Sequence, residues 1–310
     1  MTPPFNCPRF IRACLPARAG KRLDSRLITG KVGVDSILMG EVRLTAPIRD
    51  HFNRLRSEPT QFLLHDTSRL GVIIPYRNRR EHLDRFLPYI KNFLNEKGVD
   101  YRIIIVEQTD NLLFNRAALL NLGAKHCEGD CDALCFHDVD RLPVEVEYSV
   151  GNQPLSLLTQ STDEDTGKKS DYLSHYFGGI TTVRSDQFRE VNGYSNKFWG
   201  WGGEDDNLLF RFLFSGIEPC RVRRGIFLEM SHRPQVELSV DGTAPDRHER
   251  RKIRKSLMAN RRYQSAVRRG VVDPWEDGLH EMETAPESLP SVEGCERLGV
   301  DLRSLLIKEG

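Results

Sequence analysis

Leu70-Gly71-Val72-Ile73-Ile74-Pro75 is a short apolar run rich in β-branched residues, the pattern of a strand buried on both faces of a parallel sheet. A helix pattern follows, with apolar residues on one face from Leu83 to Leu94. The alternation continues with strand patterns over 101–106 and 133–136, and between them a helix pattern over 114–122 that ends at Gly123. Strands and helices alternating with short links predict an α/β fold, in which helices flank a mostly parallel twisted sheet.

Charged side chains follow two of these predicted strands. Arg77 and Arg79 come directly after the first strand, and Asp138 and Asp140 come directly after the third. Ligands of such sheets bind beyond the carboxyl ends of the strands, so we expect all four residues at one edge. Arginine suits planar recognition of phosphate, and two carboxylates one residue apart can share a divalent metal with phosphate oxygens. Each pair taken alone is equally compatible with a surface turn.

The stretch Phe198-Trp199-Gly200-Trp201-Gly202-Gly203 leads directly into three consecutive acids, Glu204-Asp205-Asp206. Tryptophan offers a flat apolar face on which a sugar ring packs, and glycine lets the backbone approach a ligand. The apolar spacing after the acids places them in the first turn of a helix. One alternative is an acidic helix start favoured by the macrodipole, which accounts for the acids but not for the aromatic residues before them.

Met230 and His232 follow another predicted strand, over 222–228. Imidazole and carboxylate ligands suit Mn²⁺, whereas a thioether is an unusual ligand for it. Combined with the arginine pair and the aspartate pair, these residues predict a nucleoside-diphosphate site beside a sugar site. The reaction expected of such a site is sugar transfer to an acceptor hydroxyl, with a carboxylate taking the proton.

The chain resembles the β-1,4-galactosyltransferase family in five motifs, which follow the family's order from about residue 70 to residue 235. The resemblance implies a single catalytic domain with a GT-A fold. It also implies a UDP-galactose donor, Mn²⁺ as cofactor, a carbohydrate acceptor, and inversion by direct displacement. The motifs are Pro75-Tyr76-Arg77-Asn78-Arg79, Phe114-Asn115-Arg116, Phe136-His137-Asp138-Val139-Asp140, Tyr176-Phe177-Gly178-Gly179 and Trp199-Gly200-Trp201-Gly202-Gly203-Glu204-Asp205-Asp206.

The same resemblance implies a role for each site residue. Asp205 is the expected general base, and Trp201 and Asp206 are expected to bind the acceptor. Asp140, Met230 and His232 are the expected metal ligands. The residues expected to hold the UDP-sugar donor are Arg77, Arg79, Phe114, Arg116, Asp138, Val139, Tyr176, Gly179 and Glu204.

Two features leave the acceptor open. Met230 and His232 are two residues apart, which resembles the xylose-accepting branch of the family. The tryptophan-glycine segment is more similar to the N-acetylglucosamine-accepting branch. Two other functions are also compatible with the residues. One is metal-dependent phosphoryl transfer at Asp138 and Asp140, and the other is a sugar-binding module without turnover.

Length and composition set the outer limits of the prediction. The 310 residues divide into an accessory segment over 1–66 with possible short strands, a catalytic domain over 67–275 and a loose tail over 276–310. A net charge of +1 argues against binding nucleic acid, although residues 247–269 are strongly basic. That segment is either a solvated helix face or a surface for an anionic acceptor.

The sequence also carries signals about compartment. No continuous apolar segment predicts a signal peptide or a transmembrane helix, so the expected location is cytoplasmic. Seven cysteines, an odd number, suggest free thiols in a reducing compartment. Cys127, Cys131 and Cys135 recur every four residues, which fits either incidental buried thiols or a zinc site.

Overall fold

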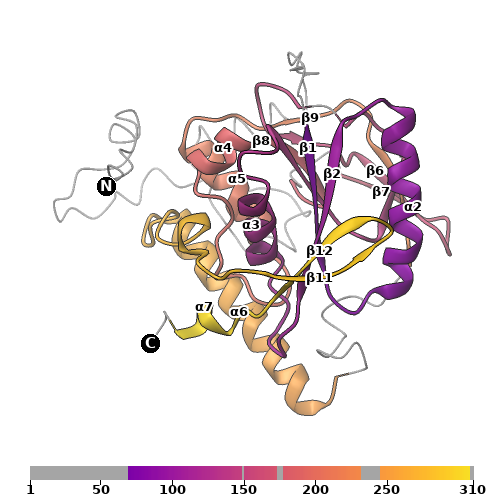
Figure 1. Ribbon diagram of the computed structural model, residues 1–310. Coiled ribbons are helices and arrows are strands. Elements are labelled where there is room, and N and C mark those ends of the chain that lie inside the picture. The colour runs from indigo at the N-terminus through magenta and orange to yellow at the C-terminus, as the bar shows by residue number, and fades with distance from the viewer. Residues whose placement is uncertain (1–68, 149, 173–176, 232–244, 308–310) are drawn as a thin grey trace.

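The computed structural model describes residues 69–148, 150–172, 177–231 and 245–307 as a layered α/β body (Figure 1). The accessory segment predicted over 1–66 lies outside the described residues. The elements, in chain order, are β1 (Leu70–Tyr76), α2 (Arg80–Glu96), β2 (Tyr101–Gln108), α3 (Arg116–His126), β3 (Ala133–His137), β4 (Arg141–Glu145), β5 (Leu155–Ser156), β6 (Gln160–Asp163), β7 (Lys169–Asp171), β8 (Ile180–Arg184), α4 (Ser185–Glu190), α5 (Glu204–Phe214), β9 (Cys220–Arg221), β10 (Ile226–Glu229), α6 (Arg247–Arg268), the 3₁₀ helix η4 (Leu279–Glu281), β11 (Glu287–Val292), β12 (Cys295–Val300) and α7 (Arg303–Ile307).

The main sheet has eight strands in the order β11-β12-β2-β1-β3-β8-β5-β9. Its centre is parallel, because β2 and β3 both pair in parallel with β1. The sheet as a whole is mixed, since β8 runs antiparallel to both β3 and β5. The α/β class with flanking helices is therefore confirmed, and the predicted strands over 70–75, 101–106 and 133–136 form its core.

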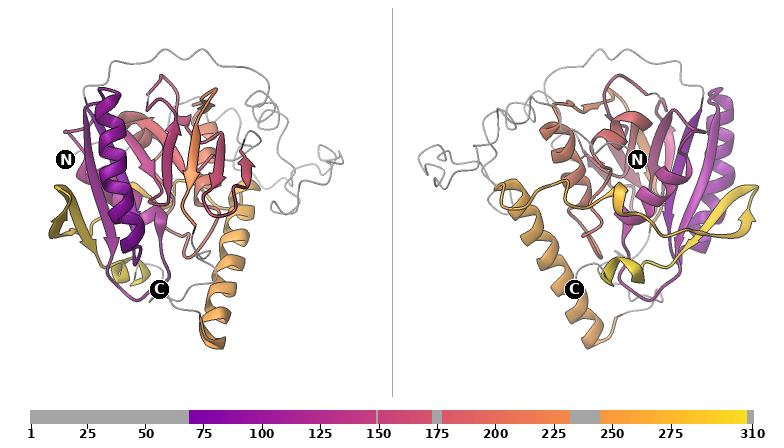
Figure 2. Two further views of the ribbon diagram at one scale, coloured as in Figure 1. Left: turned by 90° about the vertical axis from the view of Figure 1, so that its right-hand side faces the viewer. Right: turned by 60° about the vertical axis from the view of Figure 1, so that its left-hand side comes forward.

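Side chains of β1 alternate between the two faces of this sheet. Val72 and Ile74 pack with α2 in one apolar core, while Ile73 packs with α3 in the other. Figure 2 shows α2 and α3 on opposite sides of the central strands. Burial on both faces explains why β1 is a continuous apolar run instead of an alternating one.

Helix α3 corrects one sequence expectation. Gly123 does not end the helix, which continues to His126. A Cβ atom on Gly123 would lie 2.3 Å from Cγ2 of Ile73, so this glycine allows α3 to pack directly on β1. Close helix–sheet packing is a second reason for glycine, and the sequence alone does not separate it from helix termination.

A smaller sheet, in the order β4-β10-β6-β7, positions the metal-site candidates. Strand β4 begins immediately after Asp140, and β10 pairs with it in the antiparallel sense, with Glu229 opposite Arg141. The backbone N–H of Met230 donates to the carbonyl of Asp140 at 2.8 Å. Residues ninety positions apart in the chain are thereby placed side by side.

The prediction of a loose tail is wrong for residues 279–307, which contain regular secondary structure. Strands β11 and β12 form a hairpin, and β12 extends the main sheet by pairing in parallel with β2. Leu298 and Val300 are buried, and Arg102 and Glu296 form an ion pair across β2 and β12. The acids and prolines before the hairpin gave the sequence no strand pattern there, because β12 is stabilised by pairing with the edge of β2.

The cysteine spacing does not form a zinc site. Cys127 and Cys131 are buried in the core around α3, whereas Cys135 in β3 is buried in the core on the other face of the sheet. No cluster of three His, Cys, Asp or Glu side chains suited to a metal occurs within the described residues. Nor, in the same residues, is any helix long and apolar enough to cross a membrane.

Candidate active site

Four charged side chains meet beyond the carboxyl end of β3. The guanidinium of Arg116, in the first turn of α3, donates to Asp138 Oδ1 and to Asp205 Oδ1, both at 2.9 Å. Arg116 Nη1 also lies 3.8 Å from Glu204 Oε1. The side chains of Arg116, Glu204 and Asp205 are only 13%, 13% and 16% exposed. Three predicted site segments, at 116, 138 and 204–205, therefore form one half-buried charge cluster.

The first turn of α5 presents the acids to this cluster. Helix α5 begins at Glu204, as the sequence predicts, with Gly203 before it in the left-handed region at φ 103°. A Cβ atom on Gly203 would lie 2.6 Å from Cε1 of Phe198, so no other residue fits this turn without a shift. Gly203 therefore allows the tight turn that connects the Trp199–Gly202 loop to the three acids at the start of α5.

The electrostatics of the cluster favour proton exchange. Burial raises the pKa of Asp205 to about 8, and the guanidinium of Arg116 partly offsets that rise. Burial likewise raises the pKa of Glu204. Tyr194, which sequence reasoning missed, lies with its hydroxyl 3.5 Å from Asp205 Oδ1. A carboxylate with a raised pKa is the type of group expected of a general base.

The arginines after β1 lie where the sequence predicts them. Arg79 Nη1 lies 3.8 Å from Asp140 Oδ2, and this buried nitrogen has no hydrogen-bond partner within the described residues. Arg77 donates to the Leu112 carbonyl at 2.7 Å, and its guanidinium lies 5.3 Å from the ring centre of Phe114. The Phe114 carbonyl in turn accepts from the Gly200 N–H at 2.7 Å, which links the arginine side of the site to the tryptophan loop.

Two further residues predicted to bind the donor, Gly179 and Val139, lie close to Asp138. Gly179 adopts φ 75°, and its carbonyl accepts from the Asp138 N–H at 3.1 Å. Val139 is buried between the two aspartates. Tyr176 and His232 lie outside the described residues, so their predicted roles stay predictions.

The predicted acceptor side consists of an exposed tryptophan on a fixed loop. Trp201 is 54% exposed. The amide of Asn260, on α6, donates to the carbonyls of Trp199, Trp201 and Gly202 at 3.0, 3.3 and 3.1 Å. Asp206 forms an ion pair with Arg268 of the same helix at 3.5 Å. Sequence reasoning missed Asn260 and Arg268, because an amide within a basic run gives no signal of which residues it contacts.

A hollow of about 420 Å³ near α4 is separate from this cluster and contains none of the predicted site residues. Its charged lining is already paired, since Arg184 contacts Asp186 and Arg189 contacts Glu128. The chemistry of the described residues is therefore concentrated at the edge formed by β1, β3 and α5.

Comparison with known families identifies this arrangement. Residues 52–149 match the N-terminal region of glycosyl transferase group 7, and residues 162–233 match the N-terminal domain of galactosyltransferase. The two matches together cover more than half of the chain and contain every predicted site residue. The chain belongs to the β-1,4-galactosyltransferase family.

Individual relatives of the galactosyltransferase family agree with this assignment. Beta-1,4-galactosyltransferase 4 of Cricetulus griseus is 44% identical over 147 residues, which are 46% of this chain and 42% of that protein. Xylosylprotein 4-beta-galactosyltransferase of Caenorhabditis elegans is 37% identical over 155 residues, 50% of this chain and 53% of that protein. The chain thus spans about half the length of these curated relatives.

A solved galactosyltransferase structure extends the likeness beyond the matched sequence. The catalytic domain of Drosophila beta1,4galactosyltransferase 7, crystallised with xylobiose, superposes with a TM-score of 0.55 at 25% identity. The superposition covers 76% of this chain and 96% of that one. A mutant of the same Drosophila enzyme has been crystallised with manganese, UDP-Gal and xylobiose.

Proposed function

We propose that this chain transfers galactose from UDP-galactose to a hydroxyl of a carbohydrate acceptor, with inversion at the anomeric carbon and Asp205 as the general base. The observation that carries the proposal is the position of Asp205. It pairs with Arg116, which also contacts Asp138, and it lies in the first turn of α5, directly after the loop that carries Trp201. The Drosophila relative crystallised with UDP-Gal and a xylose disaccharide supports the choice of substrates.

The two oxygens of Asp205 have different surroundings. Arg116 and Tyr194 both contact Oδ1, whereas no donor within the described residues contacts Oδ2. In the proposed reaction Oδ2 accepts the proton of the acceptor hydroxyl as its oxygen attacks the anomeric carbon. The bond from that carbon to the diphosphate breaks, and its electron pair leaves with UDP. Displacement from the opposite face inverts the anomeric centre.

The arginines after β1 are the proposed diphosphate contacts. Arg79 has a buried nitrogen without a hydrogen-bond partner in the described chain, a costly state that an anionic phosphate oxygen relieves. Arg77 is held by the Leu112 carbonyl and by the ring of Phe114, which fixes the direction of its guanidinium. The same contacts place Phe114 beside the nucleotide in this proposal.

Of the proposed metal ligands, Asp140 at the end of β3 is the one carboxylate among the described residues. Asp140 supplies a carboxylate next to Arg79, and its carbonyl accepts a hydrogen bond from the backbone N–H of Met230. Asp140, Met230 and His232 are the proposed ligands of Mn²⁺, which would neutralise the negative charge of the leaving diphosphate. Asp138 is already held by Arg116, so its proposed role is toward the donor sugar and not the metal.

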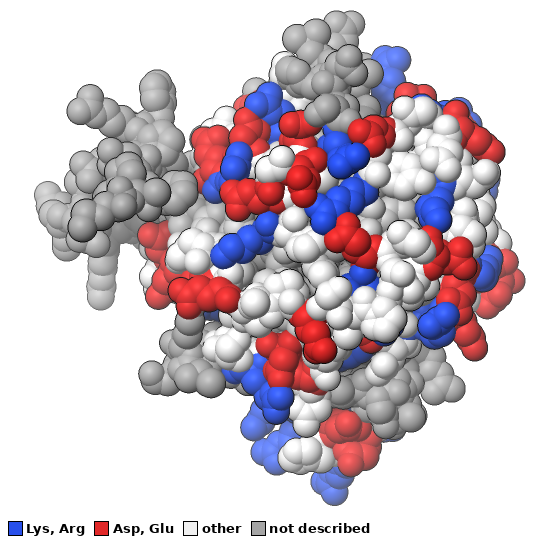
Figure 3. All heavy atoms as spheres, viewed as in Figure 1, with Lys and Arg blue, Asp and Glu red and all other residues white. Residues whose placement is uncertain are grey.

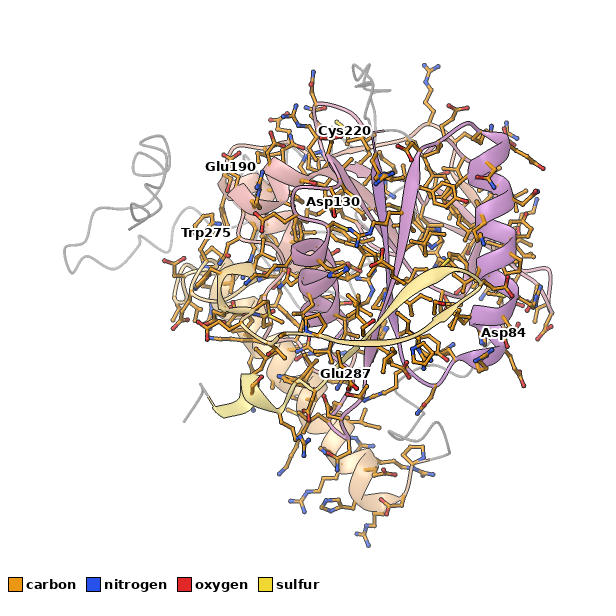
Figure 4. All side chains as sticks on the ribbon, in the orientation of Figure 1. Asp84, Asp130, Glu190, Cys220, Trp275 and Glu287 are labelled. Atoms are coloured by element: carbon orange, nitrogen blue, oxygen red, sulfur yellow. The ribbon has the colours of Figure 1, made fainter. Side chains whose placement is uncertain are left out.

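Replacing one metal ligand tests this assignment. Asp140→Asn removes an anionic ligand, so we expect weaker Mn²⁺ binding in an electron paramagnetic resonance titration and loss of most transfer from UDP-galactose. Asp84→Asn is the control, because Asp84 is an acid on the outer helix α2 (Figure 4). Transfer that continues in excess EDTA would contradict the metal site. Release of phosphate from simple esters without sugar transfer would instead support a phosphoryl-transfer enzyme.

A further inference from the structure

Helix α6 concentrates positive charge in a chain that is nearly neutral overall. Residues 247–269 contain ten Arg and Lys residues against a single Glu, while the whole chain has a net charge of +1. All of these cations except Arg268 are exposed. Lys and Arg side chains gather at the lower edge in Figure 3, where α6 projects from the body in Figure 1. In Figure 4 the nitrogen-tipped side chains of this end of α6 point away from the body.

These exposed cations lack the carboxylate partners found elsewhere on the surface. Within the part of the chain that the structure describes, none of them forms an ion pair with an acid. The guanidinium groups of Arg250 and Arg269 contact only the backbone carbonyls of Pro245 and Ser265. On other elements, exposed arginines are paired, as in Arg80–Asp84 and Arg189–Glu128. The outer face of α6 is therefore a positive surface that its neighbours do not neutralise.

The inner face of the same helix contacts the loop that carries Trp201, the proposed acceptor loop. The Ser256 hydroxyl donates to the Trp199 carbonyl, and the Asn260 amide donates to three carbonyls of the loop. Because the helix rises 1.5 Å per residue, Arg254 and Lys255 lie roughly 8 Å along the axis from Asn260. The positive surface thus begins within about two helical turns of the loop that presents Trp201.

An anionic chain fits this surface better than a lipid bilayer does. Helices that lie in a membrane interface expose a broad face of large apolar residues. On α6, Met258 is the one large apolar residue that is exposed among those the structure describes. In its C-terminal half, Asn260, Gln264 and Val267 are buried against the protein.

We propose that the outer face of α6 binds an anionic part of the acceptor, so that the acceptor is a glycoconjugate with sulfate, phosphate or carboxylate groups beyond the sugar that receives galactose. The inference rests on the proposed function, because it takes the Trp201 loop as the acceptor site. Charge complementarity at this distance strengthens acceptor binding and leaves the chemical step unchanged. Loss of this charge interaction should raise the KM for the acceptor, and the rise should become smaller as salt screens the charges.

The test compares matched acceptors and matched variants. Phenyl β-xyloside and phenyl β-N-acetylglucosaminide are each prepared with a neutral and with a disulfated aglycone. The α6 variant carries Arg251→Gln, Arg254→Gln and Lys255→Gln. The charge-matched control variant carries Lys168→Gln, Lys169→Gln and Arg223→Gln, three exposed cations outside α6.

We expect the native chain to prefer the sulfated acceptors. The α6 variant should raise KM for them by about tenfold at low salt, with kcat unchanged, and the control variant by less than about twofold. The difference should disappear near 1 M salt, where charges are screened within about 3 Å. Equal KM for neutral and sulfated acceptors, or equal losses in both variants, would overturn the proposal.

A binding measurement keeps this inference separate from the proposed function. Fluorescein-labelled sulfated glycosides are titrated by anisotropy without any donor, so the result does not depend on transfer. Weaker binding by the α6 variant than by the control supports the surface even if no galactose is transferred. If the α6 variant instead loses only affinity for vesicles of anionic lipid, or for a random RNA, the acceptor assignment is wrong.

Discussion

Asp205 experiences several opposing electrostatic effects at one carboxyl group. Burial disfavours its charged form and raises its pKa, the Arg116 guanidinium favours the charged form, and Glu204 and Asp138 oppose it. The N-terminal end of α5 adds a further effect that favours negative charge. The net result is a carboxyl group that can both lose and accept a proton near neutral pH, while Arg116 fixes its orientation.

Substitution of this residue should separate chemistry from binding. Asp205→Asn keeps the size and the acceptor oxygen for Arg116 but cannot take the proton. General-base catalysis contributes ~10²–10⁴-fold, so we expect kcat to fall by at least about a hundredfold. Turnover and UDP-galactose affinity should be measured on the same variant. Loss of donor affinity together with turnover would make Asp205 a donor-binding residue, and unchanged turnover would place the base elsewhere.

The raised pKa of Asp205 predicts two opposite pH dependences. Asp205, as the proposed base, would act only when ionised, so kcat/KM should decline as pH falls below about 8. Ionising a buried group costs stability, so its contribution to folding is full below the unfolded pKa of ~3.9 and is lost as pH rises through the folded pKa. Asp205→Asn should therefore melt at a higher temperature than the native chain at pH 9. At pH 4 the two should melt together, and equal melting at both pH values would argue against the shift.

At the scale of elements, α6 positions the loop between Phe198 and α5. One buried amide, that of Asn260, is shared among three loop carbonyls, and the Ser256 hydroxyl contacts one of them. Carbonyls that converge on one donor cannot separate without leaving a buried polar group unsatisfied. The loop is therefore held in one arrangement by a helix that comes about sixty residues later in the chain.

Asn260→Asp tests this contact with little change in size. The carboxylate cannot donate and would repel the three carbonyls, so we expect the KM for the acceptor to rise about tenfold or more while the Kd for UDP-galactose stays unchanged. Asn92→Asp, an exposed change on α2, is the matched control. If acceptor KM and donor Kd rise together, the amide supports the whole domain and not the acceptor loop specifically.

At the scale of the whole molecule, a buried ion pair joins α5 to the chain that follows α6. Arg211 and Asp277 contact each other at 3.0 Å, with side chains 0% and 2% exposed. Asp277 also accepts from Ser195 Oγ at 2.8 Å, and Arg211 donates to the carbonyls of Asn192 and Gly193. The pair thereby ties the segment before the C-terminal hairpin to the helix that carries Asp205.

Breaking this pair should destabilise the protein strongly. Asp277→Ala leaves a buried guanidinium without its counter-ion, and such changes cost about 3–5 kcal/mol of unfolding free energy. The double change Arg211→Met with Asp277→Leu removes both charges, so its loss measured by urea unfolding should be smaller. A double variant less stable than Asp277→Ala would show that the backbone contacts of Arg211 matter more than the charge pair.

The sequence by itself predicted the central strands and the helices between them, and it proposed candidate site residues whose roles stay predictions. Continuous apolar runs and period-3.6 apolar patterns depend on local sequence, so β1, β2, β3 and α5 could be predicted from neighbouring residues. The carboxyl ends of parallel strands share one edge, so the sequence predicts Arg79 near Asp140, and the two residues do lie together.

Only the tertiary structure decided the contacts between distant segments. Arg116 joins Asp138 to Asp205, Asn260 holds the tryptophan loop, and β12 completes the sheet against β2. The physical reason is that each of these interactions gains its strength from burial and from a partner far along the chain. Asn260 within a basic run, or a strand after a proline-rich segment, carries no local pattern that reveals such a partner.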